Sequence, residues 1–400
     1  MPHMELKNAQ QLLKKKEVDL LVAHTEDNVY YMSGYKDSMA DWLPILAIVP
    51  ADKVLAPSMI VNNYIEVQAR QRTYIEDVRS YPTWMPIVDV DALVKGTLKP
   101  TEKPLQFNPE QVFSLFSDIL KEKGLQKSII GIEKSLFKNQ EIYPLLTRQN
   151  PKARFVEADD ILWELRKVKT EEEIKVIRAS AEIALKGLRA VIKGGVLGAS
   201  LGELHLRYKR GVIEAATAEN AMELEKIRMS LSSGDHFGTM ENAGYRVAKG
   251  DVIFIDNGVT VFGYTSDMGR TFSVGKPGEM PKRLFEALRA GFEEAVSMVK
   301  PGVKMKEIHR VVQETVRKKG FEWYTRGHMG HSVGIGRTEQ PPFVSPNEET
   351  KLEPNMVICI ENPVHPKNGR FGGLHIEDMF LITPEGHEVL TKLPRDMVEL

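Results

Sequence analysis

Two aspartates stand eleven residues apart, each beside a stretch that is typical of a β-strand. Asp256 ends the apolar run "DVIFID", and Asp267 lies in "SDMGRTFSV", which follows the turn glycine of "VFGY". Because side chains alternate along a strand, Val252, Phe254 and Asp256 share one face. We expect a hairpin that brings both carboxylates to that face. This segment alone indicates either solvated strand ends or a site that needs a cation or a shared proton.

Two glutamates occupy similar positions near the C-terminus. The run "MVICIE" places Glu361 on one face with Cys359, and "LHIEDMFLIT" places Glu377 on one face with His375. Each apolar strand therefore carries a carboxylate where a core residue is expected. Four carboxylates on one sheet face repel one another, and two divalent cations would offset their formal charge of about −4.

A histidine in the glycine-rich stretch "GHSVGIGRTEQPPF" adds one imidazole to these carboxylates. The candidate ligands are Asp256, Asp267, His331, Glu361 and Glu377. This set is rich in hard oxygen donors, which favours two ions of Mn, Co, Fe or Zn over a lone structural zinc. No Rossmann unit follows the glycines of "GHMGHSVGIG", so a dinucleotide-binding loop is excluded.

The elements that must position these residues alternate between helices and strands, which indicates an α+β arrangement. Residues 166–195 predict one long helix. Thr170 is its expected N-cap, Glu173 completes a capping box and two glycines end it. Further helices are predicted over residues 201–225, 281–299 and 304–320.

The first part of the chain predicts a smaller α/β layer. "NAQQLLKKKEVD" has helical spacing, whereas "LLVAH", "LPILAIVP" and "SIIGIE" are typical of buried strands. "NVYYMSGY", residues 28–35, is aromatic and β-prone and ends at a glycine turn. Because 400 residues exceed one ordinary core, we expect two domains, at residues 1–158 and 159–400.

The composition excludes several classes of function. Lys+Arg number 54 against 55 Asp+Glu, without the basic stripe that nucleic-acid binding needs. The longest apolar stretch is too short to span a bilayer, and the N-terminus lacks the apolar segment of a signal peptide. The only cysteine, Cys359, is expected to be an inert buried thiol and fits a reducing compartment. We therefore expect a cytoplasmic protein that binds neither nucleic acid nor membrane.

Several of these segments resemble the signature of a known family. "IDNG…GYTSDMGRTF", "GHSVGIGRTEQPPF", "MVICIE" and "GLHIED" are similar to motifs of the pita-bread metallopeptidases, which include methionine aminopeptidase, aminopeptidase P, prolidase and creatinase. "DNVYYMSGY" and "ELRKVKTEEEIKVIRASAEIA" resemble the N-terminal domain and first catalytic helix of the prolidase and creatinase branches. The resemblance implies a pita-bread catalytic domain after a smaller α/β creatinase-type domain, in a homodimer.

The resemblance also implies a role for each candidate ligand. Matched motif by motif, the five candidates are metal ligands, and Asp267 and Glu377 bridge two ions. Glu361 is then the general base for a water activated between the ions. The implied reaction is hydrolysis of a C–N bond in a dipeptide or small amide, as in Xaa-Pro dipeptidases and aminopeptidases. Arg270, in "MGRTF", is expected to form a structural ion pair.

The chain departs from the family pattern at three positions. Thr338 and Thr239 stand where the peptidases carry histidines, and His375 stands where an arginine is common. Threonine donates a hydrogen bond but does not shuttle protons near pH 7, and loss of a donor at an oxyanion costs about 10²–10³ in rate. We expect these three residues to contact substrate. His328, His236 or His375 is expected to take over the catalytic work, unless the substrate is not an ordinary peptide. For His328, a structural role is the alternative.

Trp42, in "SMADWLP", is a further candidate for substrate binding. In the creatinase-like branch a loop of the N-terminal domain reaches the neighbouring subunit's active site, where an aromatic ring suits a prolyl ring or a cationic head. An ordinary tryptophan is the other interpretation. The missing family histidines also leave open a small-molecule enzyme, such as a creatinase-like amidinohydrolase or a metal-assisted lyase. A non-catalytic binding protein is a third hypothesis, although such a relative is expected to lose ligands.

Overall fold

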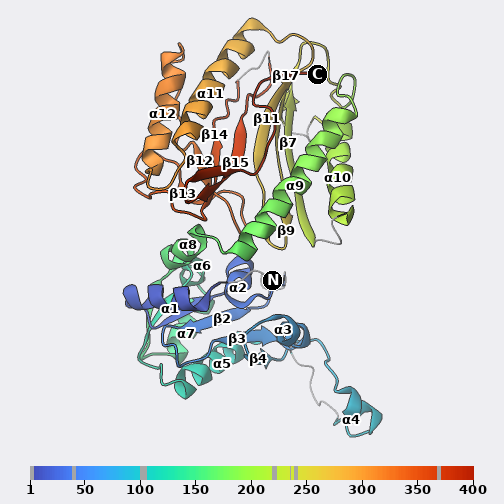
Figure 1. Cartoon of the computed structure of the whole chain (residues 1–400). Helices are drawn as coiled ribbons and strands as arrows, with labels where there is room; N and C mark the ends of the chain where they lie inside the picture. The colour runs from blue at the N-terminus through green and yellow to red at the C-terminus, as the bar shows by residue number, and fades with distance from the viewer. Residues whose placement is uncertain are drawn as a thin grey trace. The chain divides into compact units, whose positions relative to one another are not determined.

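The computed structural model divides into two compact units, Met1–Leu165 and Arg166–Leu400. It describes residues 4–37, 42–99, 106–218, 223–234, 236–237, 242–366 and 371–400. Each unit has its own sheet with helices packed on it (Figure 1). Within the described ranges, no helix is both long enough and apolar enough to cross a membrane.

The N-terminal unit is the predicted α/β layer. Its described residues form a six-stranded mixed sheet in the order β4-β3-β2-β1-β5-β6. The strands are β1 (Leu20–Ala23), β2 (Leu46–Pro50), β3 (Ser58–Asn62), β4 (Asp77–Tyr81), β5 (Ile129–Ile132) and β6 (Arg154–Glu157). The helices are α1 (Leu6–Lys15), α2 (Glu26–Ser33), α3 (Glu66–Arg72), α4 (Val90–Val94), α5 (Pro109–Glu122), α6 (Lys134–Phe137), α7 (Ile142–Gln149) and α8 (Asp159–Lys167).

The aromatic segment at residues 28–35 corrects one prediction, because most of it belongs to helix α2. The negative charges of Glu26 and Asp27 in the first turn stabilise the helix, because they lie at the positive end of its dipole. Gly34 ends the helix with φ at 72°, a conformation that glycine adopts readily. The β-prone side chains, Tyr30 and Tyr31 among them, are buried, and tertiary packing here outweighs strand propensity.

The C-terminal unit has the predicted α+β pattern. Its described part forms an eleven-stranded sheet whose main path runs β13-β12-β14-β15-β11-β9-β7-β8. The strands are β7 (Leu224–Ser233), β8 (His236–Phe237), β9 (Val252–Val261), β10 (Tyr264–Thr265), β11 (Met268–Ser273), β12 (Gly330–Ser332), β13 (Gln340–Phe343), β14 (Val357–Glu361), β15 (Glu377–Thr383), β16 (Gly386–Val389) and β17 (Val398–Glu399). The helices are α9 (Glu171–Lys193), α10 (Leu201–Ala218), α11 (Glu279–Met298) and α12 (Met305–Lys318).

The long helix α9 confirms the capping prediction. The Thr170 hydroxyl oxygen accepts a hydrogen bond from the Glu173 backbone N–H, and the Glu173 carboxylate accepts one from the Thr170 backbone N–H. Gly194 is the C-cap. Helix α10 is shorter than predicted, because it ends at Ala218 and the final residues of the predicted helix, 224–225, begin strand β7.

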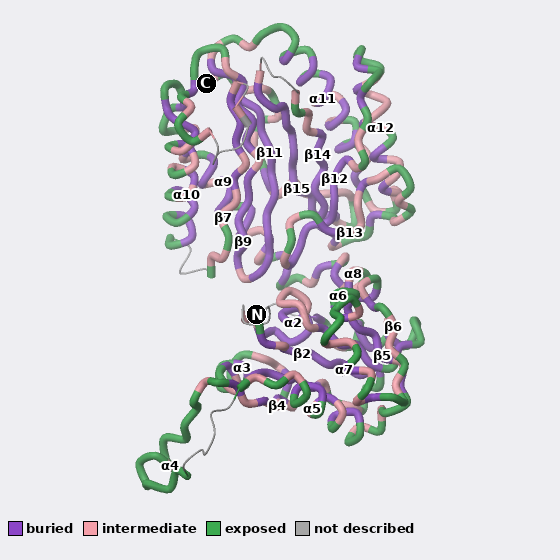
Figure 2. Tube along the Cα trace, turned by 180° about the vertical axis from the view of Figure 1, so that it is seen from behind, coloured by how far each residue is buried: buried purple, intermediate pink, exposed green. Residues whose placement is uncertain are grey.

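Two apolar cores hold the sheet of the C-terminal unit between pairs of helices. Side chains of α9 and α10 pack with those of β7, β9 and β11, and side chains of α11 and α12 pack with those of β14 and β15. The central strands are buried along most of their length (Figure 2). Polar side chains on these strands are therefore held by a backbone that packing fixes on both sides.

Candidate metal centre

The two aspartates converge through the predicted hairpin. Strands β9 and β11 pair antiparallel with Asp256 opposite Gly269, and Asp267 directly precedes β11. The absent side chain at Gly269 makes room for an imidazole, because a Cβ there would lie 1.4 Å from Cδ2 of His375. The hairpin thus presents both carboxylates from adjacent strands.

The glutamates and the histidine arrive from the neighbouring strands. Glu361 on β14 lies opposite Glu377 on β15, and His331 on β12 lies opposite Cys359 on β14. All five predicted ligands line one cavity of about 390 Å³. The lining residues are Arg228, Asp256, Asp267, His331, Arg337, Thr338, Glu339, Glu361 and Glu377.

The atoms of this cluster lie at distances that suit a shared cation. Ligand atoms of Asp267, His331, Cys359 and Glu377 lie within 4.8 Å of one another. The Nε2 atom of His331 is 3.6 Å from Oδ2 of Asp267 and 3.8 Å from Oε1 of Glu377. Burial lowers the pKa of His331, which favours the neutral imidazole that a metal ion binds. A second group of ligand atoms comes from Asp256, His375 and Glu377.

Electrostatics in the cluster favour a bound cation. Burial, with the neighbouring carboxylates acting in the same direction, raises the pKa of Asp267 and Glu377 well above their usual range, although Arg228 opposes both shifts. Because the pKa of these two carboxyl groups is so high, all the carboxylates of the cluster can ionise together only when a further positive charge is present. Burial also raises the pKa of Cys359, so the thiol stays protonated in this setting. The sulfur of Cys359 lies among the clustered ligand atoms.

Two arginines contact the carboxylates, and sequence reasoning missed both. The guanidinium of Arg326 donates to Oε1 of Glu361 at 3.1 Å and to its backbone oxygen at 3.2 Å. Arg228 on β7 donates to Oδ1 of Asp256 at 2.5 Å and to Oδ1 of Asp267. The alternation of Arg228 with Ser230 in "RMSLSS" is a strand signal, but only the pairing of β7 with β9 aims the arginine at the aspartates.

The predicted auxiliary residues separate into two groups. Thr338 lines the cavity, and His328 lies beside it, with Nδ1 3.5 Å from Oε1 of Glu361 and Nε2 3.8 Å from Oε2 of Glu339. His375 is buried with its Nε2 3.0 Å from Oε2 of Glu377, and it is absent from the described lining of the cavity. The structure thus places His375 behind a candidate ligand and not at a substrate surface.

Of the remaining candidates, His236 is not among the described residues that line the cavity. The Nδ1 atom of His236 lies 3.2 Å from Oδ1 of Asn242, and its ring centroid lies 3.9 Å from that of Tyr245. Trp42 belongs to the N-terminal unit and is 77% exposed. Thr239 lies outside the described residues.

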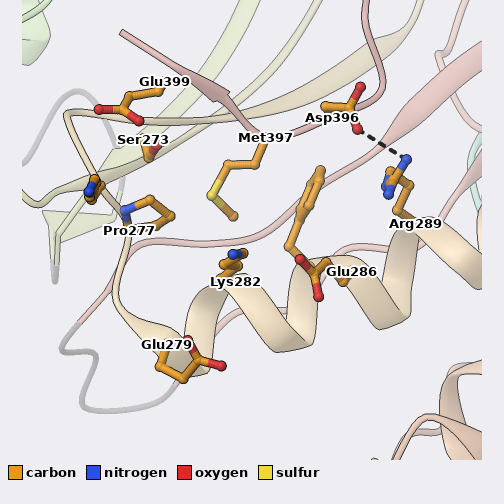
Figure 3. Close-up of a pocket in the computed structure, with 11 residues that line it drawn as sticks. Ser273, Pro277, Glu279, Lys282, Glu286, Arg289, Asp396, Met397 and Glu399 are labelled. Carbon is orange, nitrogen blue, oxygen red and sulfur yellow. Dashed lines mark ion pairs between the residues drawn. The ribbon is translucent and has the colours of Figure 1, made fainter.

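A larger cavity beside α11 does not mark the chemistry. A hollow of about 510 Å³ lies beside α11, where Lys282, Glu286 and Arg289 line it (Figure 3). The described side chains around this hollow include none of the candidate ligands. The smaller cavity, with its carboxylates and imidazole, is therefore the candidate active site.

The donor set fits a divalent ion at one position without rearrangement. Asp267, Glu377 and His331 turn ligand atoms toward one another, and Glu361 lines the same cavity. At the other position, between Asp256 and Asp267, the Arg228 guanidinium already bonds both carboxylates.

Comparisons with known proteins agree with this geometry. The profile of Metallopeptidase family M24 matches residues 175–384, and that of the Creatinase/Prolidase N-terminal domain matches residues 5–168. The chain is 26% identical to the Xaa-Pro dipeptidase of Pyrococcus horikoshii over 398 residues, 98% of both chains. It is 32% identical to the Xaa-Pro dipeptidase of Pyrococcus furiosus over 247 residues, 61% of this chain and 68% of that one.

A solved structure shares the whole architecture. The prolidase from Pyrococcus horikoshii OT3 superposes with a TM-score of 0.77 at 25% identity, over 98% of this chain and 99% of that one. Fold and site together define a metal-dependent hydrolase with a pita-bread catalytic unit. The chain belongs to Metallopeptidase family M24, with a creatinase-type N-terminal domain, which confirms the resemblance read from its motifs.

Proposed function

We propose that this enzyme is a divalent-metal-dependent dipeptidase that cleaves dipeptides with proline in the second position. The observation that carries the proposal is the convergence of four carboxylates and His331 on one cavity. The full-length similarity to a Xaa-Pro dipeptidase supports the choice of substrate class. A cavity of about 390 Å³ also suits a small substrate.

The proposed ligands are Asp256, Asp267, His331, Glu361 and Glu377. A bound divalent ion would polarise the scissile carbonyl and make water a stronger nucleophile near neutral pH. The oxygen-rich donor set supports Mn among the candidates Mn, Co, Fe and Zn.

Glu361 is the proposed general base. Burial alone would raise its pKa, but Arg326, with the nearby histidines, brings the pKa of Glu361 below its usual value. The carboxylate is therefore ionised near neutral pH and able to accept a proton. Arg326 also fixes its orientation through two hydrogen bonds, one to the side chain and one to the backbone.

His328 is the proposed substitute for the missing family histidine. It is half-buried, with one ring nitrogen near Glu361 and the other near Glu339, and Glu339 lines the cavity beside Thr338. The His328 imidazole, 3.5 Å from Glu361, is positioned for general acid–base catalysis, and the Thr338 hydroxyl would donate a hydrogen bond to the substrate carbonyl. This arrangement supports peptide hydrolysis despite the departure at Thr338, and the relatives do not favour the small-molecule alternative.

We further propose a cytoplasmic homodimer. The support for a dimer is a group of exposed aliphatic side chains on and before α4, because clustered exposed apolar side chains often mark association surfaces. These side chains are Ile87, Val88, Val90, Leu93 and Val94. Light scattering of the purified protein tests the dimer, and Val94→Glu should shift it toward monomer.

A substrate panel tests the proposed function. Protein depleted of metal and then supplied with Mn²⁺ or Co²⁺ is expected to hydrolyse Ala-Pro, Met-Pro and Leu-Pro faster than Ala-Ala. Glu361→Gln should reduce kcat by about 10² or more, because it removes the proposed base and a ligand together. Equal rates for Ala-Pro and Ala-Ala would contradict the proposed specificity.

A further inference from the structure

Arg228 stands where the second of two metal ions would be held. Its guanidinium donates through Nη1 to Oδ1 of Asp256 at 2.5 Å and through Nη2 to Oδ1 of Asp267. Arginine stays protonated in proteins, and two nitrogens of one planar group reach two carboxylates here, as one divalent ion would. The aspartate pair therefore already shares a cation that the chain itself supplies.

The sheet is built to admit this side chain. Arg228 on β7 lies opposite Gly258 on β9, and Asp256 stands two residues along β9 on the same face. A Cβ at Gly258 would lie only 3.2 Å from Nη2 of Arg228 and 1.9 Å from the backbone oxygen of Ser266. The missing side chain lets the guanidinium lie across β9 toward the aspartates. The Arg228 side chain is 35% exposed, so it forms part of the cavity wall.

The charges of the cavity balance with one divalent ion. The four candidate carboxylates carry a formal charge of −4. Arg228, on the aspartates, and Arg326, on Glu361, contribute +2 between them. Arg337 and Glu339 also line the cavity and offset each other. One divalent ion completes neutrality, whereas two would leave an excess of +2 beside the arginines.

The carboxylate oxygens that do not contact Arg228 define the position for the remaining metal ion. Oδ2 of Asp267 faces Nε2 of His331 at 3.6 Å, and Oε1 of Glu377 faces the same nitrogen at 3.8 Å. Glu361 reaches the same cavity from β14. Three carboxylates and one imidazole would leave positions for substrate on a six-coordinate ion such as Mn.

We propose that Arg228 replaces the second metal ion, so that the centre holds one divalent ion bound by Asp267, His331, Glu361 and Glu377. The two ions expected from the sequence become one ion and one guanidinium. Asp256 then anchors Arg228 and is no longer a direct ligand. The inference rests on the proposed metal-dependent function and specifies its stoichiometry.

Counting bound metal tests this directly, without an activity assay. Metal-depleted protein is loaded with Mn²⁺, dialysed and analysed by mass spectrometry of the element. Wild type is expected to keep about one Mn per chain and Arg228→Met about two, because removal of the guanidinium frees the aspartate pair. Electron paramagnetic resonance should show a spin-coupled Mn pair in Arg228→Met and an isolated ion in wild type.

Lys226→Met is the matched control. Lys226 is exposed on the same strand, two residues away, and its replacement removes the same charge without touching the carboxylates. It should keep the wild-type count. Thermal unfolding of metal-depleted Arg228→Met shows whether the variant folds. If the variant does not fold, the number of Mn ions bound per wild-type chain alone decides the test.

The outcomes separate this inference from the proposed function. Two Mn per wild-type chain, or one per folded Arg228→Met chain, overturns the role of Arg228. Two Mn together with Xaa-Pro hydrolysis overturns the inference and leaves the proposed function standing. Wild type that binds no divalent metal overturns both.

Discussion

The buried ion pair of Arg270 gives a prediction about what holds the metal-binding strands together. Arg270 on β11 donates to Oδ1 of Asp378 at 2.6 Å and to the backbone oxygen of Glu377 at 2.6 Å. The two side chains of the pair are 2% and 1% exposed, which confirms the structural ion pair predicted for Arg270. The arginine thus joins β11, which follows Asp267, to the start of β15, which carries Glu377.

The cost of removing Arg270 follows from these contacts. In Arg270→Met, Asp378 loses a fully desolvated partner, and breaking such a pair costs about 3–5 kcal/mol. The loss of donors to buried backbone oxygens adds about 1 kcal/mol or more. Asp378 keeps the Nε donor of Arg395 at 2.8 Å and the hydroxyl of Thr391 at 2.9 Å, which offset part of the loss. We expect a net loss of about 3–5 kcal/mol in the free energy of unfolding of the C-terminal unit.

Urea unfolding of metal-loaded protein measures this loss, and a second ion pair supplies the control. Arg289 and Asp396 pair at 3.0 Å beside the hollow on α11 (Figure 3), with side chains 40% and 72% exposed. Because solvent screens that pair, Arg289→Met should cost less than about 1 kcal/mol. Arg270→Met should also weaken Mn²⁺ binding, since it releases the Glu377 backbone. Equal losses in the two variants would refute the argument that burial of the pair sets its strength.

Three further predictions concern the cavity and its supports. Gly330 has φ at 145°, and a Cβ there would lie 2.0 Å from the backbone oxygen of Cys359. Gly330→Ala should therefore move His331 and weaken Mn²⁺ binding about ten-fold or more in calorimetric titration. An unchanged affinity for Mn²⁺ would contradict this prediction. Burial lowers the pKa of Lys169 to about 7 in the folded protein, whereas a lysine in the unfolded chain has a pKa of about 10.4. Between these two pH values the unfolded chain binds the extra proton, so the free energy of unfolding should rise by up to about 1.4 kcal/mol per pH unit. Lys169→Met should remove that rise, as urea midpoints at pH 7 and pH 9 would reveal. Thr338→His should raise kcat for Met-Pro about ten-fold, and an unchanged kcat would mean that the position does not limit the reaction.

Local sequence patterns predicted much of the secondary structure. The period-two alternation around Asp256 and Glu361 predicted strands and faces correctly, because that alternation is a property of the strand itself. The capping box of Thr170 and Glu173 is likewise local and was confirmed. The segment at residues 28–35 failed because burial of its aromatic side chains, which depends on the rest of the unit, decided its conformation.

The arginines and His375 show where sequence reasoning stops. Arg228 reaches the aspartates only because β7 pairs with β9 in one register, and that register is set by contacts between distant segments. Arg326 lies in a loop whose approach to Glu361 no periodicity indicates. His375 was expected on one strand face with Glu377, but β15 begins only at Glu377. The ring of His375 instead fills the space above Gly269, next to Glu377 and outside the described lining of the cavity.

The central claim is that the carboxylate–histidine cavity holds a divalent ion that hydrolysis requires. Titration of metal-depleted protein with Mn²⁺, with Met-Pro hydrolysis followed at each addition, tests it most directly. The account predicts no hydrolysis without metal and a rise that saturates as the cavity fills, with Asp267→Asn showing neither binding nor rise. Hydrolysis that persists after chelation, or a cavity that fills with Mn²⁺ while Met-Pro stays intact, would contradict it.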